Sequence, residues 1–171
     1  MIHTIGHSTR PIQSFLELLE AYAIRQLADV RTVPRSRRHP QFTQDSFRAS
    51  LHAQHIVYRH FPGLGGLRKP RADSINSGLT NPSFRGYADH MQTEEFRRAF
   101  AELEVFAGEA ATAVMCAEAV WWKCHRRLLA DALLVHGVPV LHIVSRTTAK
   151  PHELSEFARE RDGGVIYPGL L

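Results

Sequence analysis

The chain has few cysteines, few lysines and no long hydrophobic run, and these shortages exclude several classes of protein. Two cysteines among 171 residues are too few for a disulfide-stabilised scaffold. No apolar stretch approaches the roughly 20 residues that cross a bilayer, and the first residues lack the basic and apolar regions of a secretory signal. We therefore expect a cytoplasmic protein with reduced thiols and no membrane partner.

Several common catalytic signatures are also missing. The chain contains no Gly-x-x-x-x-Gly-Lys loop, no Gly-x-Ser-x-Gly turn and no His-Glu-x-x-His sequence, which excludes the usual signatures of ATPases, α/β-hydrolases and zinc proteases. The stretch 63–68 departs from a Gly-x-Gly-x-x-Gly loop because its last residue is Arg68. Neither cysteine begins a Cys-x5-Arg loop, since Trp122 and Ala130 occupy the positions where arginine is needed. A cysteine phosphatase is therefore not expected.

Arginine supplies nearly all of the positive charge, and it is unevenly distributed. Only three of the 21 basic residues are lysine. Residues 1–72 carry eleven basic against four acidic residues, whereas residues 73–171 carry ten against thirteen. Arginine recognises phosphate and carboxylate in a bidentate manner, so the first part of the chain is a candidate for binding anions.

Short apolar strands alternate with amphipathic helices along the chain, and this alternation predicts the fold. We expect strands at 2–6, 26–30, 56–58, 111–115 and 138–143, and helices at 11–23, 45–53, 84–91, 95–107 and 125–136. The pattern predicts a three-layer α/β sandwich on a mostly parallel, Rossmann-like sheet, with the entirely apolar fourth strand at its centre. Residues 1–171 form one domain in this interpretation, with a core at about 2–143. Residues 144–171 add a short helix around 152–159 and an apolar end, while 60–83 form a long irregular loop.

Polar side chains follow four of these strands at the point where each strand ends. Ligands of parallel α/β folds bind at the carboxyl ends of the strands. The residues that we expect at this rim are His7, Ser8, Asp29, Arg31, Gly65, Gly66, Cys116 and Glu118. Their convergence from separate loops predicts a binding or catalytic site.

Cys124 and His125 stand where the helix 125–136 is expected to begin. A thiol at a helix N-terminus is favoured as thiolate by the free N–H groups and the helix dipole. We predict that Cys124, in an exposed and basic setting, or His125 supplies nucleophilic or acid–base chemistry, with Glu118 as an orienting group or proton acceptor. Cys116 ends an apolar strand, so a reactive thiol and a small buried residue are equally good interpretations of it.

The arginines around this rim suggest the ligand. Arg31, Arg37 and Arg126 are candidates for holding an anion, and Ser36 adds a hydroxyl. The first hypothesis is thus an enzyme or ligand-binding domain that acts on an anionic, phosphate-bearing, nucleotide-like molecule. The sequence specifies no cofactor and no oligomeric state.

Two alternatives come from other classes of function. The basic first part of the chain and a pI near 9.4 are also compatible with a nucleic-acid-binding or nucleic-acid-processing module. A thiolate–histidine metal site could draw on Cys116, Cys124 and His125, with His7 as a further candidate ligand. The Cys-x7-Cys-His spacing is not that of common zinc modules. Several other histidines are scattered and are expected at the surface: His52, His55, His90, His136 and His152.

Six groups of residues together resemble a known family. They are Thr4–Ser8, Asp29–Arg31 followed by Pro34, Ser36 and Arg37, Leu64–Gly66, Tyr87 with Met91, Cys116 with Glu118, and Cys124–Arg126. This combination, from residue 2 to about 143, resembles the domain-of-unknown-function family 488 of bacteria and archaea. The resemblance implies the α/β sandwich and adds Tyr87 to the candidate ligand-binding residues, but it implies no particular activity.

Overall fold

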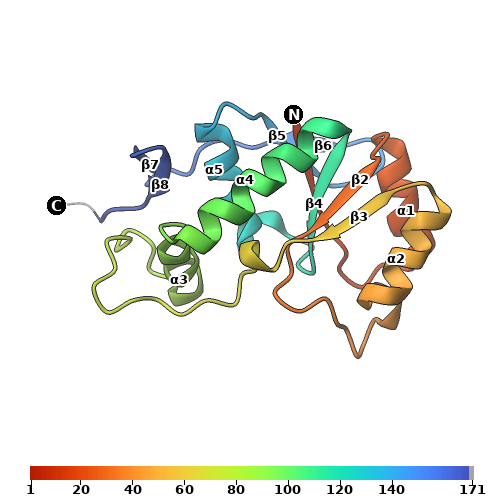
Figure 1. Ribbon diagram of the computed structural model, residues 1–171, viewed down its shortest axis with the longest axis horizontal. Helices are drawn as coiled ribbons and strands as arrows, with labels where there is room; N and C mark the ends of the chain where they lie inside the picture. Colours follow the sequence, from red (N-terminus) through yellow and green to blue (C-terminus); the bar gives the residue numbers. More distant parts are fainter. Residues whose placement is uncertain (170–171) are drawn as a thin grey trace.

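One mixed sheet organises the computed structural model, which describes residues 1–169 (Figure 1). Its strand order is β3-β2-β4-β1-β5-β6. The bounds are β1 Ile2–Gly6, β2 Gln26–Asp29, β3 Val57–His60, β4 Thr112–Cys116, β5 Val140–Ile143 and β6 Ala149–Pro151. The strands β1 to β5 run parallel, and only β6 runs antiparallel to its neighbour β5. The apolar strand β4 lies between β2 and β1, as predicted, and every residue of it is buried.

Helices cover both faces of this sheet and produce the three predicted layers. Their bounds are α1 Ile12–Ala21, α2 Gln44–Ala53, α3 Pro82–His90, α4 Glu94–Glu109 and α5 Arg126–Val135. In Figure 1, α1 and α2 lie on one side of the sheet and α4 and α5 on the other. Successive side chains of a strand point to opposite faces, so Ala113 and Met115 of β4 pack with α1 and α2, whereas Val114 and Cys116 pack with α3, α4 and α5.

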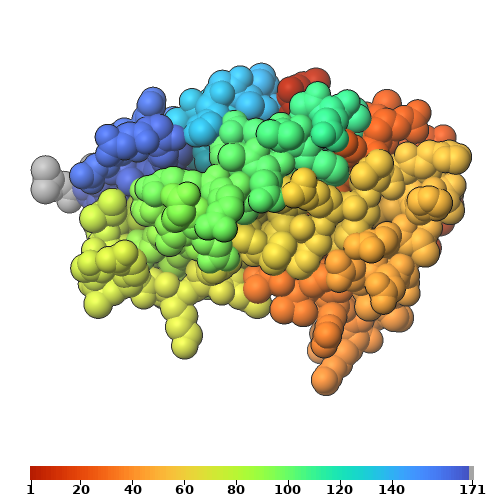
Figure 2. All heavy atoms as spheres, viewed as in Figure 1, coloured from red at the N-terminus to blue at the C-terminus, as the bar shows by residue number. Residues whose placement is uncertain are grey.

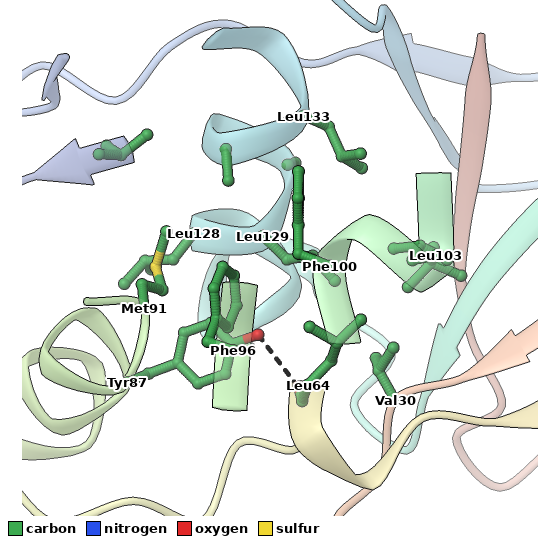
Figure 3. Packing of buried hydrophobic residues seen from close by; sticks show 14 of the residues in the cluster. Val30, Leu64, Tyr87, Met91, Phe96, Phe100, Leu103, Leu128, Leu129 and Leu133 are labelled. Atoms are coloured by element: carbon green, nitrogen blue, oxygen red, sulfur yellow. Dashed lines mark hydrogen bonds between the residues drawn. The ribbon is translucent and has the colours of Figure 1, made fainter. Parts of the chain in front are cut away.

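The larger of the two cores lies between the sheet and helices α3, α4 and α5. Figure 3 shows Phe96, Phe100 and Leu103 of α4 facing leucines of α5, with Tyr87 of α3 beside them. The Tyr87 hydroxyl donates a hydrogen bond of 3.0 Å to the backbone oxygen of Leu64, drawn dashed in Figure 3. This bond ties the irregular segment that follows β3 to the helical layer.

The arginine-rich loop between β2 and α2 stands out from this compact body. In the space-filling view it projects as the orange protrusion at the lower edge of the molecule (Figure 2). Residues 65–81 contain no helix or strand, as the density of proline and glycine predicts. Among the residues that the structure describes, no helix has the length and apolar character that a membrane span requires.

The predicted helix around residues 152–159 is wrong. This segment is irregular because tertiary hydrogen bonds replace helical ones: the Asp131 carboxylate accepts from both the His152 ring and the Ser155 backbone N–H. A hairpin of β7 (Arg159–Arg161) and β8 (Gly164–Ile166) follows. Its two turn residues, Asp162 and Gly163, both have positive φ, which is typical of the tight turns that join antiparallel strands.

Candidate functional site at the carboxyl ends of the strands

Three strand ends are joined directly by backbone hydrogen bonds at one edge of the sheet. The N–H of His7 donates to the Cys116 oxygen at 3.0 Å, and the N–H of Val30 donates to the Met115 oxygen at 2.9 Å. A cavity of about 360 Å³ opens beside them. It is lined by the loops after β2 and β4, by Gly66 and Leu67, by the start of α3 and by Cys124 and His125. The predicted convergence of loops is therefore present in the fold.

Two free thiols lie in contact at the floor of this cavity. The Sγ atoms of Cys116 and Cys124 are 2.6 Å apart, and both residues are buried although both line the cavity. The expectation that Cys124 is exposed is wrong. The 3-10 turn Trp121–Lys123 folds the chain back, which places Cys124 against the end of β4.

The His125 ring is fixed on both of its edges. Its Nε2 lies 3.0 Å from the backbone oxygen of Val30. A carbonyl oxygen can only accept, so Nε2 carries a hydrogen and Nδ1 faces Cys124 Sγ, 3.5 Å away. Gly66 makes room for the ring, because a methyl group at that position would lie 2.3 Å from Nδ1. Nδ1 can therefore accept the Cys124 proton or share it.

The surroundings of the two thiols shift their pKa values in opposite directions. The hydrogen bond from the Cys116 S–H lowers the pKa of Cys124 well below the ordinary thiol value, and His125 and Arg126 add to this against the opposing effect of burial. The same hydrogen bond, together with burial, raises the pKa of Cys116. The arrangement favours a thiolate on Cys124 and a proton on Cys116.

Arg126 is a buried cation beside these sulfurs. It is only 1% exposed, and its guanidinium donates to the backbone oxygen of Glu118 and to Thr4 Oγ1. Burial lowers the pKa of Arg126, but the neighbouring charges of Cys116 and Cys124 more than offset this and raise it overall. The guanidinium of Arg126, predicted from the sequence to hold an external anion, is hydrogen-bonded to these two protein oxygens.

A buried relay of hydrogen bonds continues from Arg126 into the protein and was not foreseen from the sequence. Thr4 Oγ1 lies 2.6 Å from His142 Nδ1, His142 Nε2 lies 3.0 Å from His152 Nδ1, and His152 Nε2 lies 2.9 Å from Asp131. Arginine can only donate and a carboxylate can only accept. The outer bonds therefore run from Arg126 to Thr4 and from His152 to Asp131. With both histidine rings neutral, the two bonds between them run in the same direction, from Thr4 to His142 and from His142 to His152. This relay connects a buried cation to a buried anion.

Two histidines that were expected at the surface are therefore buried. His152 belongs to the relay, and the His90 ring donates a 2.7 Å hydrogen bond to the Gly63 backbone oxygen.

Burial lowers the pKa of His142 to about 3, so this ring is neutral as the relay requires. Trp121 stacks on it at 3.9 Å. One sequence signal pointed here: His142 interrupts an apolar strand, and a buried polar group needs a partner.

Arg31 is engaged by the protein rather than free to bind a ligand. Its Nε and one terminal nitrogen donate to the Asp29 carboxylate, with a closest N–O distance of 2.6 Å. Another nitrogen donates to the Phe42 backbone oxygen at 2.8 Å. The Tyr58 hydroxyl also donates to the Asp29 carboxylate. Burial, together with the negative charge of this carboxylate, raises the pKa of Tyr58. The Asp29–Arg31 pair builds the loop after β2, and only Arg31 reaches the cavity wall.

The remaining predicted residues divide between two neighbouring hollows. His7, Ser8, Ser36 and Arg37 line a second hollow of about 500 Å³, and Glu118 with Ala117 borders both hollows. His7 is held by stacking on Phe42 and by the Ser8 oxygen, and burial lowers its pKa to about 4.

Gly65 and Tyr87 support the site from behind. A methyl group on Gly65 would collide with Thr32, and Tyr87 packs 4.9 Å from the His125 ring. Lys123 and Arg35 are exposed cations on the wall of the first cavity.

Comparison with known proteins identifies a family for the chain. No curated protein and no solved structure is significantly similar to the chain. A family model described as "Domain of unknown function DUF488" matches residues 11–133, and this segment includes Cys116, Cys124, His125 and Arg126. Because that match covers well over half of the sequence, the chain belongs to the DUF488 family, the family suggested by its motifs.

Proposed function

We propose that the protein is an enzyme whose Cys124 thiolate attacks a small, anionic, nucleotide-like ligand bound in the 360 Å³ cavity. The observation that carries this proposal is the position of Cys124 Sγ on the cavity floor, between the Cys116 thiol and His125 Nδ1. The cavity volume falls in the range of small-molecule sites.

The residues around Cys124 have distinct roles in this proposal. Arg35 and Lys123 attract the anion, because Arg31 is already paired with Asp29. The Cys124 proton passes to His125 Nδ1, and the thiolate forms a bond to the electrophilic centre. The leaving group departs with the electron pair and takes that proton from Nδ1. Glu118, whose carboxylate accepts a hydrogen bond from the Val120 N–H, shapes the edge shared by the two hollows.

Alkylation by iodoacetamide tests this proposal. Mass spectrometry should show Cys124 modified at a rate that stays high at neutral pH and is lost as the pH falls through the lowered pKa of its thiol. Cys116 should react far more slowly, because its pKa is raised. Cys124→Ser should abolish the fast reaction, and Cys116→Ser should leave a reactive thiol with a higher pKa. An ordinary thiol rate for Cys124 in the intact protein would contradict the proposal.

Protection against this alkylation identifies the ligand class. Mononucleotides and inorganic phosphate should slow the reaction, and removing both cations with Arg35→Ala and Lys123→Ala should weaken protection about tenfold, the equivalent of about 1.4 kcal/mol. Lys150→Ala, an exposed lysine outside this cavity, is the matched control. Protection by oligonucleotides alone, with a steep dependence on salt, would instead favour the nucleic-acid hypothesis.

A metal site is a second candidate for the same residues. One ligand atom each of Cys116, Cys124 and His125 lies within 4.8 Å of the others. His125 donates its other ring N–H to a backbone carbonyl, as metal-bound histidines usually do. Two thiolates and an imidazole suit Zn²⁺.

Elemental analysis separates the metal candidate from the thiolate enzyme. After equilibration with Zn²⁺ and removal of the excess, one zinc per chain is expected, and it should be lost in Cys116→Ser, Cys124→Ser and His125→Ala but kept in His136→Ala. Bound zinc should also block alkylation of Cys124. Substoichiometric zinc that is insensitive to these substitutions would reject the candidate.

A further inference from the structure

The proposed function uses one cysteine as the nucleophile, but the structure places a second cysteine directly beside it. They are the only cysteines of the chain, they are free, and their sulfur atoms are in contact. Both line the cavity, so a molecule that reaches one sulfur lies beside the other. Seven residues separate them, and the intervening turn is closed by backbone hydrogen bonds at Lys123 and Cys124. A bond between the sulfurs therefore needs no large movement of the chain.

We propose a second activity for this site: Cys124 and Cys116 act as attacking and resolving thiols that reduce a small, negatively charged disulfide, leaving an internal Cys116–Cys124 disulfide. The inference rests on the reactive Cys124 thiolate of the proposed function, and it adds a redox partner that the first reaction does not require.

The chemistry proceeds in two exchange steps. The Cys124 thiolate attacks one sulfur of the substrate disulfide, so that a mixed disulfide forms and the first thiolate leaves with the electron pair. Cys116 then loses its proton and attacks Cys124 Sγ, which releases the second thiolate. The two protein thiols are oxidised by two electrons, and the substrate is reduced by the same two electrons to two thiols. Two equivalents of an external thiol return the protein to the dithiol form.

The protein groups around the sulfurs fit both steps. Of the two sulfurs in contact, Cys124 Sγ is the one that faces a ring nitrogen, 3.5 Å from His125 Nδ1, so the first attack is assigned to Cys124. His125 Nδ1, 3.5 Å from Cys124 Sγ, is the nearest base for the proton of the resolving thiol. Arg126, buried against both sulfurs, stabilises negative charge on either one. Each sulfur is therefore equipped for the step assigned to it.

The cavity wall indicates which disulfides can enter. Arg35 and Lys123 bring positive charge to it, and the exposed side chains of Val33 and Leu67 add apolar surface. A disulfide that carries carboxylates on short apolar arms matches this lining. A positively charged disulfide of similar size does not, because it meets two like charges.

Intact mass spectrometry tests the reaction with glutathione disulfide as the anionic probe and cystamine as the cationic one. The reduced protein treated with glutathione disulfide should lose two hydrogen atoms and carry no adduct. Cys116→Ser should accumulate the glutathione adduct on Cys124, because the resolving thiol is missing. Cys124→Ser should remain unmodified over the same time. Circular dichroism of each variant establishes that its fold is intact.

Charge selectivity is the second arm of the experiment. Glutathione disulfide should react about tenfold or more faster than cystamine at low ionic strength, and this preference should shrink in high salt. The double variant Arg35→Ala, Lys123→Ala should lose the preference, whereas Lys150→Ala should keep it. Equal rates for the two disulfides in the unmodified protein would overturn the substrate assignment.

The results also separate this inference from the proposed function. If Cys124 is alkylated rapidly and nucleotides protect it, but the unmodified protein keeps a glutathione adduct as Cys116→Ser does, only the dithiol reaction is wrong. If Cys124 reacts with neither iodoacetamide nor glutathione disulfide, the reactive thiolate itself is wrong and both proposals fall.

Discussion

Replacing Asp29 with asparagine should lower the free energy of unfolding by about 3–5 kcal/mol, the cost of removing one partner of a buried ion pair. The Asp29 carboxylate is fully buried, and Arg31 beside it is only 6% exposed. Asparagine keeps the shape of the side chain but leaves the guanidinium of Arg31 without its anion. Because domains are stable by only about 5–15 kcal/mol, this single change threatens folding.

Glu102→Gln is the matched control for this prediction. The Arg59–Glu102 pair has the same 2.6 Å N–O distance as Arg31–Asp29, but both of its side chains are about half exposed. Exposed pairs contribute about 0–1 kcal/mol, so this variant should unfold almost like the unmodified protein. Urea titrations with equal m-values measure both differences. If both variants lowered the free energy of unfolding by a similar small amount, burial would not determine how much the Asp29–Arg31 pair stabilises the protein.

Gly6→Ala should destabilise the protein by about 3 kcal/mol, the upper end of typical overpacking costs. A methyl group at Gly6 would lie 1.9 Å from the backbone oxygen of Glu118 and 2.9 Å from the Ala119 Cα. Backbone atoms cannot rotate out of the way as a flexible side chain can. The loop after β4 must therefore move, and with it the carbonyl that accepts the hydrogen bond of Arg126.

Gly108→Ala serves as the control for added methyl volume. Gly108 lies in α4, and nothing is within 4 Å of the position that its methyl group would take. Alanine is favoured over glycine in helices by about 0.5–1 kcal/mol, so this variant should be slightly more stable. Thermal unfolding of both variants, together with the alkylation rate of Cys124 in Gly6→Ala, measures the effect. A Gly6→Ala protein with unchanged stability and thiol reactivity would show that the strand ends are not tightly joined.

The layers of the fold were predictable because strands and helices repeat their apolar residues with different periods. The strand β4 was placed correctly at the centre of the sheet. The segment 152–159 was not predictable in this way, because Asp131, more than twenty residues earlier, determines its conformation. Local patterns carry no information about such distant partners.

The sequence could predict where the residues of the candidate site lie, but not which of them contact one another. Strand ends and helix starts located Cys116 and Cys124 at the rim. The contact between them depends on how a short turn folds. The same turn buries Cys124, which was predicted to be exposed. Likewise, a run of arginines suggests anion binding, but only the structure shows that Arg31 has its anion within its own loop.

The relay from Arg126 to Asp131 bears on where the functional unit of this chain begins and ends. The family match covers residues 11–133, so it contains both charged ends of the relay. Thr4, His142 and His152, which connect those ends, all lie outside it. A fragment trimmed to the matched residues would keep Arg126 and Asp131 and lose the three side chains that join them. Continuity of hydrogen bonds, rather than sequence similarity, sets the boundaries of the smallest piece that can carry this site.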